Sequence, residues 1–357
     1  MSPNAQAQEK SAPAENTLTL PALWYHDAKI YETERSNLFF SDWQLFCHEA
    51  LVEKPGQYVA QTIAGRPVMV LRGKDGKLKA FHNVCRHRAS TVLQEGHGTT
   101  QVLRCMYHGW VYDTDGKLAK APGFGGDEAS LCDRTSLFPV HVESSNGLVF
   151  ICMAEKPPVF AKSLGGLPKA LEGTGIEKFK FFSMATHPMK CNWKTYIENY
   201  MEGYHIPVIH PELNRDVDFE TYKVIEGDRI ARHETGIRPE RAAVAQNSGL
   251  WLWLWPNVAI NIYKNGMNLE IVMPTGPETS ELRYCYLFND VSPEAEKANQ
   301  EAIDLSFLVT QQDIDICEVV QKNLQAGVYH TGELSPRHEN GVVYFHDLVR
   351  EVHGEKR

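Results

Sequence analysis

Two short segments of the sequence carry cysteine and histidine side chains at close spacing. Cys85 and His87 are separated by one residue, and Cys105 and His108 by two residues. Both pairs lie within the stretch NVCRHRASTVLQEGHGTTQVLRCMYHGW. Thiolates and imidazoles bind either Zn²⁺ or the irons of an iron–sulfur cluster. The four side chains therefore predict a metal centre, with zinc and iron–sulfur as the two alternatives.

The order of the ligands favours iron and sulfur over zinc. Zinc fingers tend to pair cysteine with cysteine and histidine with histidine, whereas each segment here offers one of each. That alternation suits a Rieske [2Fe–2S] centre, in which two thiolates hold one iron and two imidazoles hold the other. The segments Cys85–His87 (CRH) and Cys105–Trp110 (CMYHGW) closely resemble the Rieske signature.

The other residues of the two segments predict a cluster of low reduction potential. Respiratory Rieske proteins, which have high potentials, carry a further cysteine in each segment, joined as a disulfide, and a serine hydroxyl that bonds a cluster sulfide. The corresponding positions here are Ser90, Tyr107 and Trp110, so neither feature can form in that way. Because fewer hydrogen bonds to the sulfurs stabilise the reduced cluster less, we expect a donor of low-potential electrons.

A second group of possible metal ligands lies in the C-terminal half. His205 and His210 stand five residues apart in NWKTYIENYMEGYHIPVIHPEL, and Glu202 precedes His205 by three residues. Asp313 follows much later, in the predicted helix TQQDIDICEVVQKNL. Two imidazoles and one carboxylate form the facial triad of non-haem Fe(II), which leaves positions open for O₂ and substrate. Asp315 is the nearest competitor for the carboxylate, and spacing favours Asp313.

The pattern of apolar residues predicts a β-rich first half and a mixed second half. The dipeptides Asp115-Gly116 and Asn146-Gly147 indicate hairpins, and Lys156-Pro157-Pro158 indicates a linker. Expected strands are Tyr58–Ile63, Pro67–Leu71, Leu148–Met153, Leu250–Tyr263 and Met267–Pro274, and expected helices are Trp193–Tyr204 and Pro293–Leu324.

The two sets of ligands, in this order, resemble the α (terminal oxygenase) subunit of Rieske non-haem iron ring-hydroxylating oxygenases. The resemblance runs from LPALWYHDAKIYETE to LSPRHENGVVYFHDL. It implies an α+β fold, with a β-sandwich Rieske [2Fe–2S] domain beside a catalytic domain whose central antiparallel sheet is flanked by helices in a helix-grip arrangement. The implied division is a disordered leader (1–16), an N-terminal segment that packs on the catalytic domain (17–40), the Rieske domain (41–155) and the catalytic mononuclear-iron domain (156–357).

The resemblance also implies roles for the residues singled out above. Cys85, His87, Cys105 and His108 would hold the [2Fe–2S] cluster, and His205, His210 and Asp313 would hold a mononuclear Fe(II) that uses O₂ as co-substrate. Glu202 occupies the place of the acid that bridges a Rieske histidine of one subunit and an iron-ligating histidine of the next; carnitine-type oxygenases are similar in having Glu there. Electrons would come from NAD(P)H through a ferredoxin and/or a flavin reductase. The chain length favours a homotrimer without a separate β subunit.

The sequence leaves the substrate open. Trp251, Trp253 and Trp255 are predicted on one face of a strand, where they either pack in the core or, with Asn261 and Tyr263, line the substrate pocket. An aromatic cage would suit a quaternary ammonium group. The stretch WPNVAINIY resembles the corresponding strand of choline- and carnitine-type oxygenases, although the following KNGM departs from the GPWM of choline-type members. We therefore expect hydroxylation or demethylation of a small amine or aromatic compound, with cis-dihydroxylation of an aromatic ring as the alternative.

Composition excludes other classes of protein. The net charge of −9 argues against a nucleic-acid surface, and no apolar run approaches the ~20 residues of a membrane span. The first residues lack the apolar segment of a signal peptide, so the expected location is the cytoplasm. Two rival functions remain, a Rieske electron carrier fused to an unrelated domain and a zinc-stabilised binding module. Neither accounts for the triad of His205, His210 and Asp313.

Overall fold

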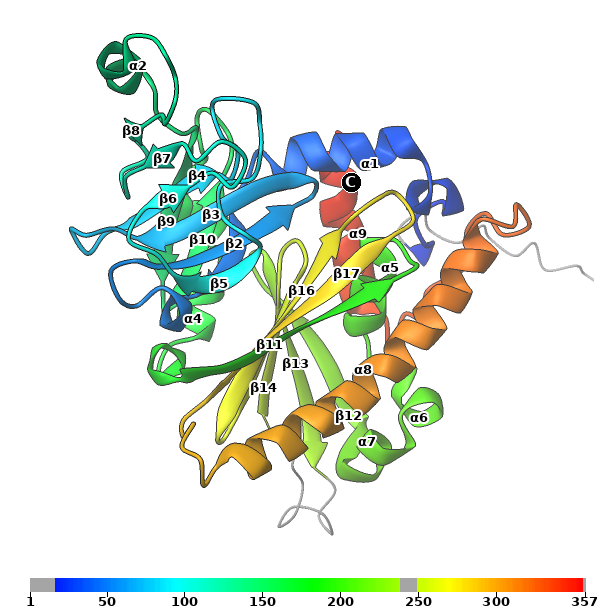
Figure 1. The fold of residues 1–357 in the computed structure, drawn as a ribbon. Helices are drawn as coiled ribbons and strands as arrows, with labels where there is room; N and C mark the ends of the chain where they lie inside the picture. The colour runs from blue at the N-terminus through cyan, green and yellow to red at the C-terminus, as the bar shows by residue number, and fades with distance from the viewer. Residues whose placement is uncertain (1–16, 238–248, 356–357) are drawn as a thin grey trace, which may run out of the picture.

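The computed structural model describes residues 17–237 and 249–355 (Figure 1). The expected leader, 1–16, lies outside the described residues. The strands of the first half are β1 (Gln44–His48), β2 (Gln57–Ile63), β3 (Arg66–Arg72), β4 (Leu78–His82), β5 (Gly96–Thr99), β6 (Leu103–Arg104), β7 (Val111–Tyr112), β8 (Leu118–Lys120), β9 (Pro139–Ser145) and β10 (Leu148–Cys152). Those of the second half are β11 (Lys180–Met189), β12 (Val217–Glu226), β13 (Ile230–Ile237), β14 (Gly249–Leu254), β15 (Val258–Tyr263), β16 (Gly266–Pro274) and β17 (Ser280–Phe288).

Helices flank both groups of strands. The α-helices are α1 (Ala28–Glu34), α2 (Glu128–Arg134), α3 (Phe160–Ser163), α4 (Leu167–Ala170), α5 (Trp193–Tyr200), α6 (Ile206–Ile209), α7 (Pro211–Asp216), α8 (Glu296–Leu324) and α9 (Asn340–Val352). Short 3₁₀ helices cover η2 (Ala22–Tyr25), η4 (Glu49–Leu51) and η5 (Ile176–Lys178), and η3 (Arg35–Phe39) is a π-helical turn. None of the described helices is long and apolar enough to cross a membrane.

The first half folds as two antiparallel sheets, which confirms the predicted β-sandwich. The larger sheet has the order β1-β10-β9-β4-β3-β2-β5, and the smaller one β6-β7-β8. The predicted hairpin signal at Asn146-Gly147 joins β9 to β10, with both residues at positive φ (53° and 77°). This pair of left-handed residues gives the turn whose twist matches that of the strands. Ala64 and Gly65 join β2 to β3 in the same way.

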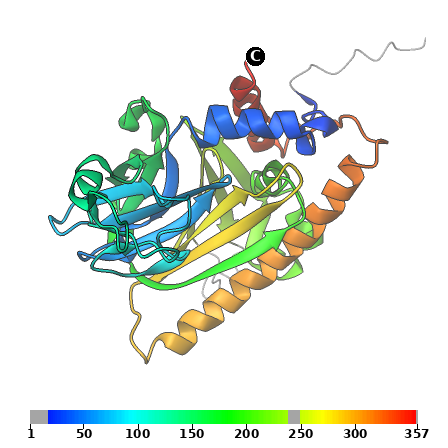
Figure 2. The same cartoon turned by 45° about the horizontal axis from the view of Figure 1, so that its top comes forward.

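The second half is built on one antiparallel sheet in the order β11-β17-β16-β15-β14-β13-β12. In Figures 1 and 2 the long helix α8 runs obliquely across this sheet. Helix α5 packs on β16 and on α8, and α9 packs on β12. The predicted α+β fold, with a central antiparallel sheet flanked by helices, is therefore confirmed.

Two predicted elements are wrong in their extent. The expected strand Leu250–Tyr263 is a hairpin of β14 and β15, because Trp255 and Pro256 interrupt it. The expected helix from Trp193 ends at Tyr200, after which the chain turns towards His205. A Cβ atom on Gly203 would lie 2.6 Å from the ring of Tyr222, so a larger residue here would have to displace that ring.

The N-terminal segment 17–40 is fastened to the helix that precedes the second group of ligands. Glu34 is buried and accepts hydrogen bonds from Trp193 Nε1 at 2.8 Å and from Lys194 Nζ at 2.6 Å, at the start of α5. The side chain of Lys194 is also fully buried. Since breaking a buried ion pair leaves an uncompensated charge, these contacts fix the position of α5. The expected domain boundaries at 41–155 and 156–357 remain a prediction.

The two halves touch through polar contacts between β2 and the central sheet. Arg283 of β17 donates from Nη2 to the carbonyl oxygen of Thr62 at 2.7 Å and from Nη1 to Gln61 at 3.2 Å. The loops around β6 and β7 nevertheless lie at the opposite end of the molecule from α6 and α7, as Figure 1 shows. Within one chain, the two predicted metal centres are therefore far apart.

Candidate active site

The structure brings His205, His210 and Asp313 together. Their candidate ligand atoms all lie within 4.8 Å of one another. His210 Nε2 is 2.9 Å from Asp313 Oδ1, and His205 Nε2 is 3.6 Å from the same oxygen. The competing Asp315 is exposed on α8, where it accepts a hydrogen bond from Gln311 at 2.7 Å. Two imidazole nitrogens and one carboxylate on one side of a common point are the donor set of a facial triad.

Each histidine is oriented by a hydrogen bond from its other ring nitrogen. His205 Nδ1 lies 2.5 Å from Glu202 Oε1, and His210 Nδ1 lies 2.7 Å from Gln312 Oε1. Both partners are acceptors, so each imidazole donates from Nδ1 and keeps the lone pair of Nε2. Metal-bound histidines are usually held in this way. The site thus fits a metal ion, with Nε2 of both rings free to bind it.

The local fold explains how these side chains converge. Glu202 also accepts hydrogen bonds from the backbone N–H groups of Tyr204 and His205, which caps the turn between α5 and α6. His205 precedes α6 and His210 lies between α6 and α7, each helix having proline in its first turn. One short helix therefore separates the two imidazoles, and Asp313 reaches them from α8.

The two segments that resemble the Rieske signature also bring their cysteine and histidine side chains together. Cys85 and Cys105 are buried side by side, whereas His87 and His108 are exposed. The Nδ1 atoms of His87 and His108 lie 3.1 Å apart. Thiols inside and imidazoles outside, each pair close together, fit a cluster whose sulfur-held iron is buried and whose histidine-held iron faces the surface.

Sequence reasoning missed a hydrogen bond to one of these sulfurs. The hydroxyl group of Tyr112 lies 3.2 Å from Cys85 Sγ and accepts from the backbone N–H of Arg86 at 3.0 Å. With a thiolate at Cys85, the hydroxyl group donates to the sulfur. The position of Tyr112 four residues after His108 was the available signal. The low reduction potential of the cluster stays a prediction. The hydrogen bond from Tyr112 is one more to a cluster sulfur than the sequence indicated.

The three tryptophans have different surroundings. Trp253 is fully buried and packs on Trp255 and on Phe345 of α9, with ring centroids 6.0 and 5.7 Å apart. Trp255 lies in the β14–β15 turn, not on the strand face expected for it, and also packs on Phe345. Trp251 is half-buried and hydrogen-bonded to Tyr263. The structure thus places the last two tryptophans of the triplet against α9, and Trp251 beside Tyr263.

Asn261 belongs to a buried polar network that the sequence did not indicate. Its Oδ1 accepts from the Tyr200 hydroxyl group at 2.8 Å, and its Nδ2 donates to Asn268 at 2.8 Å and to Glu270 Oε1 at 2.6 Å. Burial raises the pKa of Glu270 to about 8, although hydrogen bonds from Tyr284 and Asn261 favour its charged form. The alternation of residues along β15 and β16 was the only signal for this cluster.

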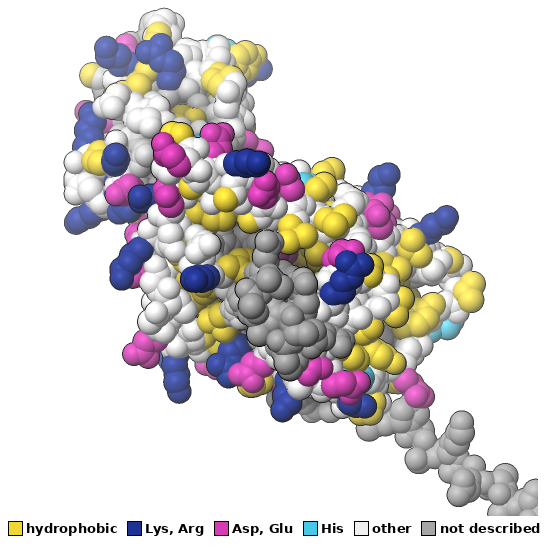
Figure 3. Space-filling view, turned by 90° about the horizontal axis from the view of Figure 1, so that it is seen from below, with side chains coloured by type: hydrophobic (Ala, Val, Ile, Leu, Met, Phe, Trp, Pro, Cys, Tyr) yellow, Lys and Arg dark blue, Asp and Glu magenta, His cyan; other side chains and the backbone are white. Residues whose placement is uncertain are grey.

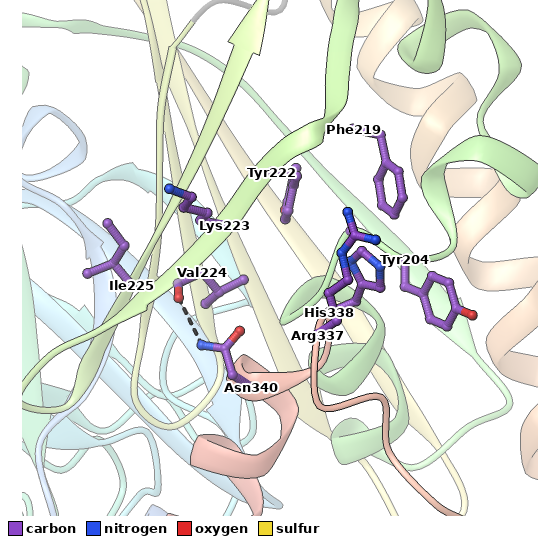
Figure 4. A pocket seen from close by; sticks show the side chains of 10 residues that line it. Tyr204, Phe219, Tyr222, Lys223, Val224, Ile225, Arg337, His338 and Asn340 are labelled. Atoms are coloured by element: carbon purple, nitrogen blue, oxygen red, sulfur yellow. Dashed lines mark hydrogen bonds between the residues drawn. The ribbon is translucent and has the colours of Figure 1, made fainter.

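A surface cavity of about 170 Å³ is lined by Gly203 and Tyr204, the two residues that follow Glu202. Figure 4 shows Tyr204, Phe219, Arg337 and His338 gathered on one side of it. The ring of His338 stacks on Tyr204 and on Phe219, with centroid distances of 5.0 and 5.1 Å. Aromatic rings therefore line one side of the cavity, and its other lining residues include Lys223, Val224, Ile225 and Asn340.

Comparison with known proteins places this arrangement in a family. The model of the ring hydroxylating alpha subunit (catalytic domain) matches residues 176–355, and that of the Rieske [2Fe-2S] domain matches residues 42–131. The chain belongs to the ring-hydroxylating α-subunit family. This ring-hydroxylating α subunit is accordingly an oxidoreductase, a terminal Rieske oxygenase, and its cofactors are a Rieske [2Fe–2S] cluster and a mononuclear iron.

Named relatives share nearly the whole chain. Choline monooxygenase of Atriplex hortensis is 28% identical over 95% of this chain and 79% of its own. The carnitine monooxygenase oxygenase subunit of Escherichia coli K12 is 29% identical, over 94% and 93%. A quaternary ammonium Rieske monooxygenase solved with L-carnitine has a TM-score of 0.84 at 26% identity, covering 95% of this α subunit and 97% of that chain. Naphthalene 1,2-dioxygenase with indole, at 20% identity and a TM-score of 0.76, shares the fold.

Proposed function

We propose that this α subunit is the oxygenase component of a monooxygenase for a quaternary ammonium compound. The observation that carries the proposal is the convergence of His205, His210 and Asp313, with both Nε2 atoms directed at the carboxylate. The relatives that share nearly the whole chain are named for choline and carnitine. Trp251 and Tyr263 supply aromatic faces of the kind that attract such cations.

The residues of the two centres have distinct roles in this proposal. His205, His210 and Asp313 hold the iron, and the segments Cys85–His87 and Cys105–His108 hold the cluster. Once bound, the iron and the cluster would each supply one electron for the reduction of O₂. Glu202 fixes the Nδ1–H tautomer of His205, and Gln312 that of His210. Both imidazoles are thereby presented through Nε2 without reorganisation.

Electrons pass between copies of the chain in the proposed homotrimer. The cluster segments and α6 lie at opposite ends of one chain, so a neighbour must bring its cluster to Glu202 (Figure 1). The aromatic cavity beside Glu202 is a suitable surface for this contact. Met106 and Tyr107, which are 62% and 56% exposed on the cluster segment, offer apolar side chains to it. A ferredoxin and/or flavin reductase would reload the cluster from NAD(P)H.

A mixed-subunit experiment tests whether electrons pass from the cluster of one copy to the iron of another. One variant, Cys105→Ser, lacks the cluster, and a second, His205→Ala, lacks the mononuclear iron. Each variant alone should be inactive, whereas their co-expression should restore turnover because a cluster in one copy can serve an iron in the next. Co-expressed variants without any restored turnover would contradict electron transfer between copies. Light scattering should give about three times the mass of 40.4 kDa.

A substrate panel tests the chemistry. Choline, L-carnitine and glycine betaine should stimulate O₂ uptake with stoichiometric product, measured together with H₂O₂ to expose uncoupling. Methoxy-aromatic compounds and aromatic acids serve as the comparison. Coupled oxidation of an aromatic compound, without turnover of any quaternary amine, would overturn the substrate class and leave the enzyme class intact. Aromatic substrates and cis-dihydroxylation are not expected, since the ring dioxygenases are similar in fold alone.

A further inference from the structure

Glu270 is a buried acid on the face of the central sheet that the helices cover. It lies on β16, where its cross-strand neighbours are Ala259 of β15 and Tyr284 of β17. Directly paired residues share one face of an antiparallel sheet. Ala259 pairs in turn with Trp253, which packs on α9. Glu270 therefore points into the layer between the sheet and the helices, and only 7% of it is exposed.

The partners of Glu270 within this layer are uncharged. Asn261 Nδ2 donates to its Oε1 at 2.6 Å, and Tyr284 provides a second hydrogen bond. Among residues 17–237 and 249–355, no lysine or arginine forms an ion pair with Glu270. The charged group that acts on it is Asp313, which has the same sign. Burial therefore favours the protonated form of Glu270, and a cation beside it would stabilise the carboxylate that this layer otherwise disfavours.

Glu270 lies close to the proposed iron site. Tyr284, its hydrogen-bond partner, is 2.6 Å from Thr310 Oγ1 on α8, one helical turn before Asp313. Tyr196 of α5 is near both acids, since each helps to raise the pKa of its hydroxyl group. A ligand beside Glu270 in this layer would thus lie next to the three-residue metal cluster.

Aromatic rings surround the acid on the same face. Tyr263 is close enough for Glu270 to raise the pKa of its hydroxyl group, and Tyr263 is hydrogen-bonded to Trp251. Tyr286 stacks on Tyr284, with ring centroids 5.1 Å apart. An anion among aromatic faces is the arrangement that a methylated ammonium group prefers, because ring faces and carboxylate both attract its spread positive charge.

We propose that Glu270 is the counter-charge for the ammonium group of the substrate and that it selects cations over neutral molecules of the same shape. The inference rests on the proposed quaternary ammonium chemistry and names the residue that recognises it. Acidic and basic side chains are intermixed on the face seen in Figure 3, so that face presents no single-sign patch that would draw in a cation. A charge inside the site adds to the attraction of the aromatic rings and acts at short range.

The decisive measurement compares a quaternary amine with its carbon isostere. Choline and 3,3-dimethylbutan-1-ol differ only in the central atom of the trimethyl group, nitrogen or carbon. Binding to the holoenzyme is measured without O₂ by calorimetry, for the wild type, Glu270→Gln and Glu234→Gln. Glutamine keeps the size and the hydrogen-bonding groups but not the charge. Glu234 is an exposed acid of β13 in the same sheet, so its variant changes the net charge by the same amount.

The expected result is a loss of selectivity in one variant. The wild type and Glu234→Gln should bind choline at least tenfold more tightly than the isostere, and Glu270→Gln should lose most of this preference and keep only what the aromatic rings contribute. The same comparison is made with L-carnitine and its carbon isostere. A preference for the cation that is undiminished in Glu270→Gln overturns the role of Glu270 but leaves the proposed function standing. A wild type that binds neither choline nor L-carnitine overturns both.

A second measurement on the wild type decides the matter if the variant fails to fold. The groups that face Glu270 are Asp313 of α8, Tyr196 and Tyr200 of α5, Tyr263 of β15, and Tyr284 and Tyr286 of β17. Burial raises the pKa of these tyrosines, so they stay neutral at neutral pH. Because burial raises the pKa of the Glu270 carboxyl group, affinity for choline should rise with pH through the neutral range, while affinity for the isostere stays constant. Equal pH profiles would refute the role.

Discussion

Gln312 Oε1 accepts a hydrogen bond from His210 Nδ1 at 2.7 Å, on the helix that also carries Asp313. The corresponding partner of His205 is a carboxylate, Glu202, at 2.5 Å. The two imidazoles are therefore held by different chemistry. A carboxylate makes its histidine a stronger donor to a metal, whereas a neutral amide orients the ring without adding charge.

Replacing Gln312 by leucine should weaken iron binding by about 10- to 100-fold, because His210 would lose the bond that sets its tautomer. Iron titration of the apo-protein measures this, and the absorption of the cluster should not change. Gln311→Leu is the matched control, since Gln311 is the adjacent glutamine, is exposed and donates a hydrogen bond to exposed Asp315. Equal iron affinity of the two variants would show that Gln312 does not position His210.

Glu202→Gln should keep both metal centres and lose coupled turnover by at least about tenfold, because the amide can still cap the turn but carries no charge. Stopped-flow mixing of the reduced enzyme with O₂ and substrate measures the reoxidation of the cluster. Iron content and cluster absorption are the controls. Reoxidation at the wild-type rate would rule out Glu202 as the bridge between copies.

Tyr112→Phe should lower the reduction potential of the cluster. The hydroxyl group of Tyr112 contributes a hydrogen bond to Cys85 Sγ that favours the more negative, reduced state. A hydrogen bond with a net free energy of about 1 kcal/mol corresponds to a change of about 40 mV in the reduction potential for one electron. Spectroelectrochemical titration measures it, and an unchanged potential would mean that the hydroxyl group does not bond the sulfur in the holoprotein.

Glu270→Gln should stabilise the protein, and more strongly as the pH rises. In the unfolded chain Glu270 loses its proton near pH 4, whereas in the folded protein its pKa is about 8. The folded state therefore binds more protons between these values, so wild-type stability declines with pH across this window, by up to about 1.4 kcal/mol per unit from this group. Melting temperatures of the wild type and the variant at pH 5, 6.5 and 8 should diverge. A difference in melting temperature between Glu270→Gln and the wild type that is the same at all three pH values would contradict the raised pKa. Glu234→Gln is expected to show such a constant difference.

Local signals in the sequence were sufficient where chemistry depends on short spacing. The cysteine and histidine pairs, and the Asn146-Gly147 turn, are determined by neighbours along the chain. Asp313 could be preferred over Asp315 by spacing, and the structure places Asp313 beside the two histidines. The family resemblance supplied the fold class, which a list of predicted strands alone would not have determined.

Interactions between distant elements could not be predicted in this way. Tyr112, Gln312 and Glu270 act through partners brought to them by strand pairing or helix packing, and no spacing rule identifies those partners. Trp255 was expected on a strand because it continues the alternation of Trp251 and Trp253, but Pro256 ends β14 there. Tertiary contacts, not local pattern, decide which residues of an apolar strand face a helix and which face a cavity.

The buried pair of Glu34 and Lys194 has a practical consequence for protein engineering. It ties the beginning of the chain to α5, and α5 leads directly into Glu202 and His205. An affinity tag or a fusion partner is therefore tolerated best upstream of residue 17, where it leaves this anchor intact. A deletion that reaches Glu34 should produce an enzyme whose cluster assembles normally but whose oxygen chemistry is impaired, although the deleted residues lie more than 150 positions away.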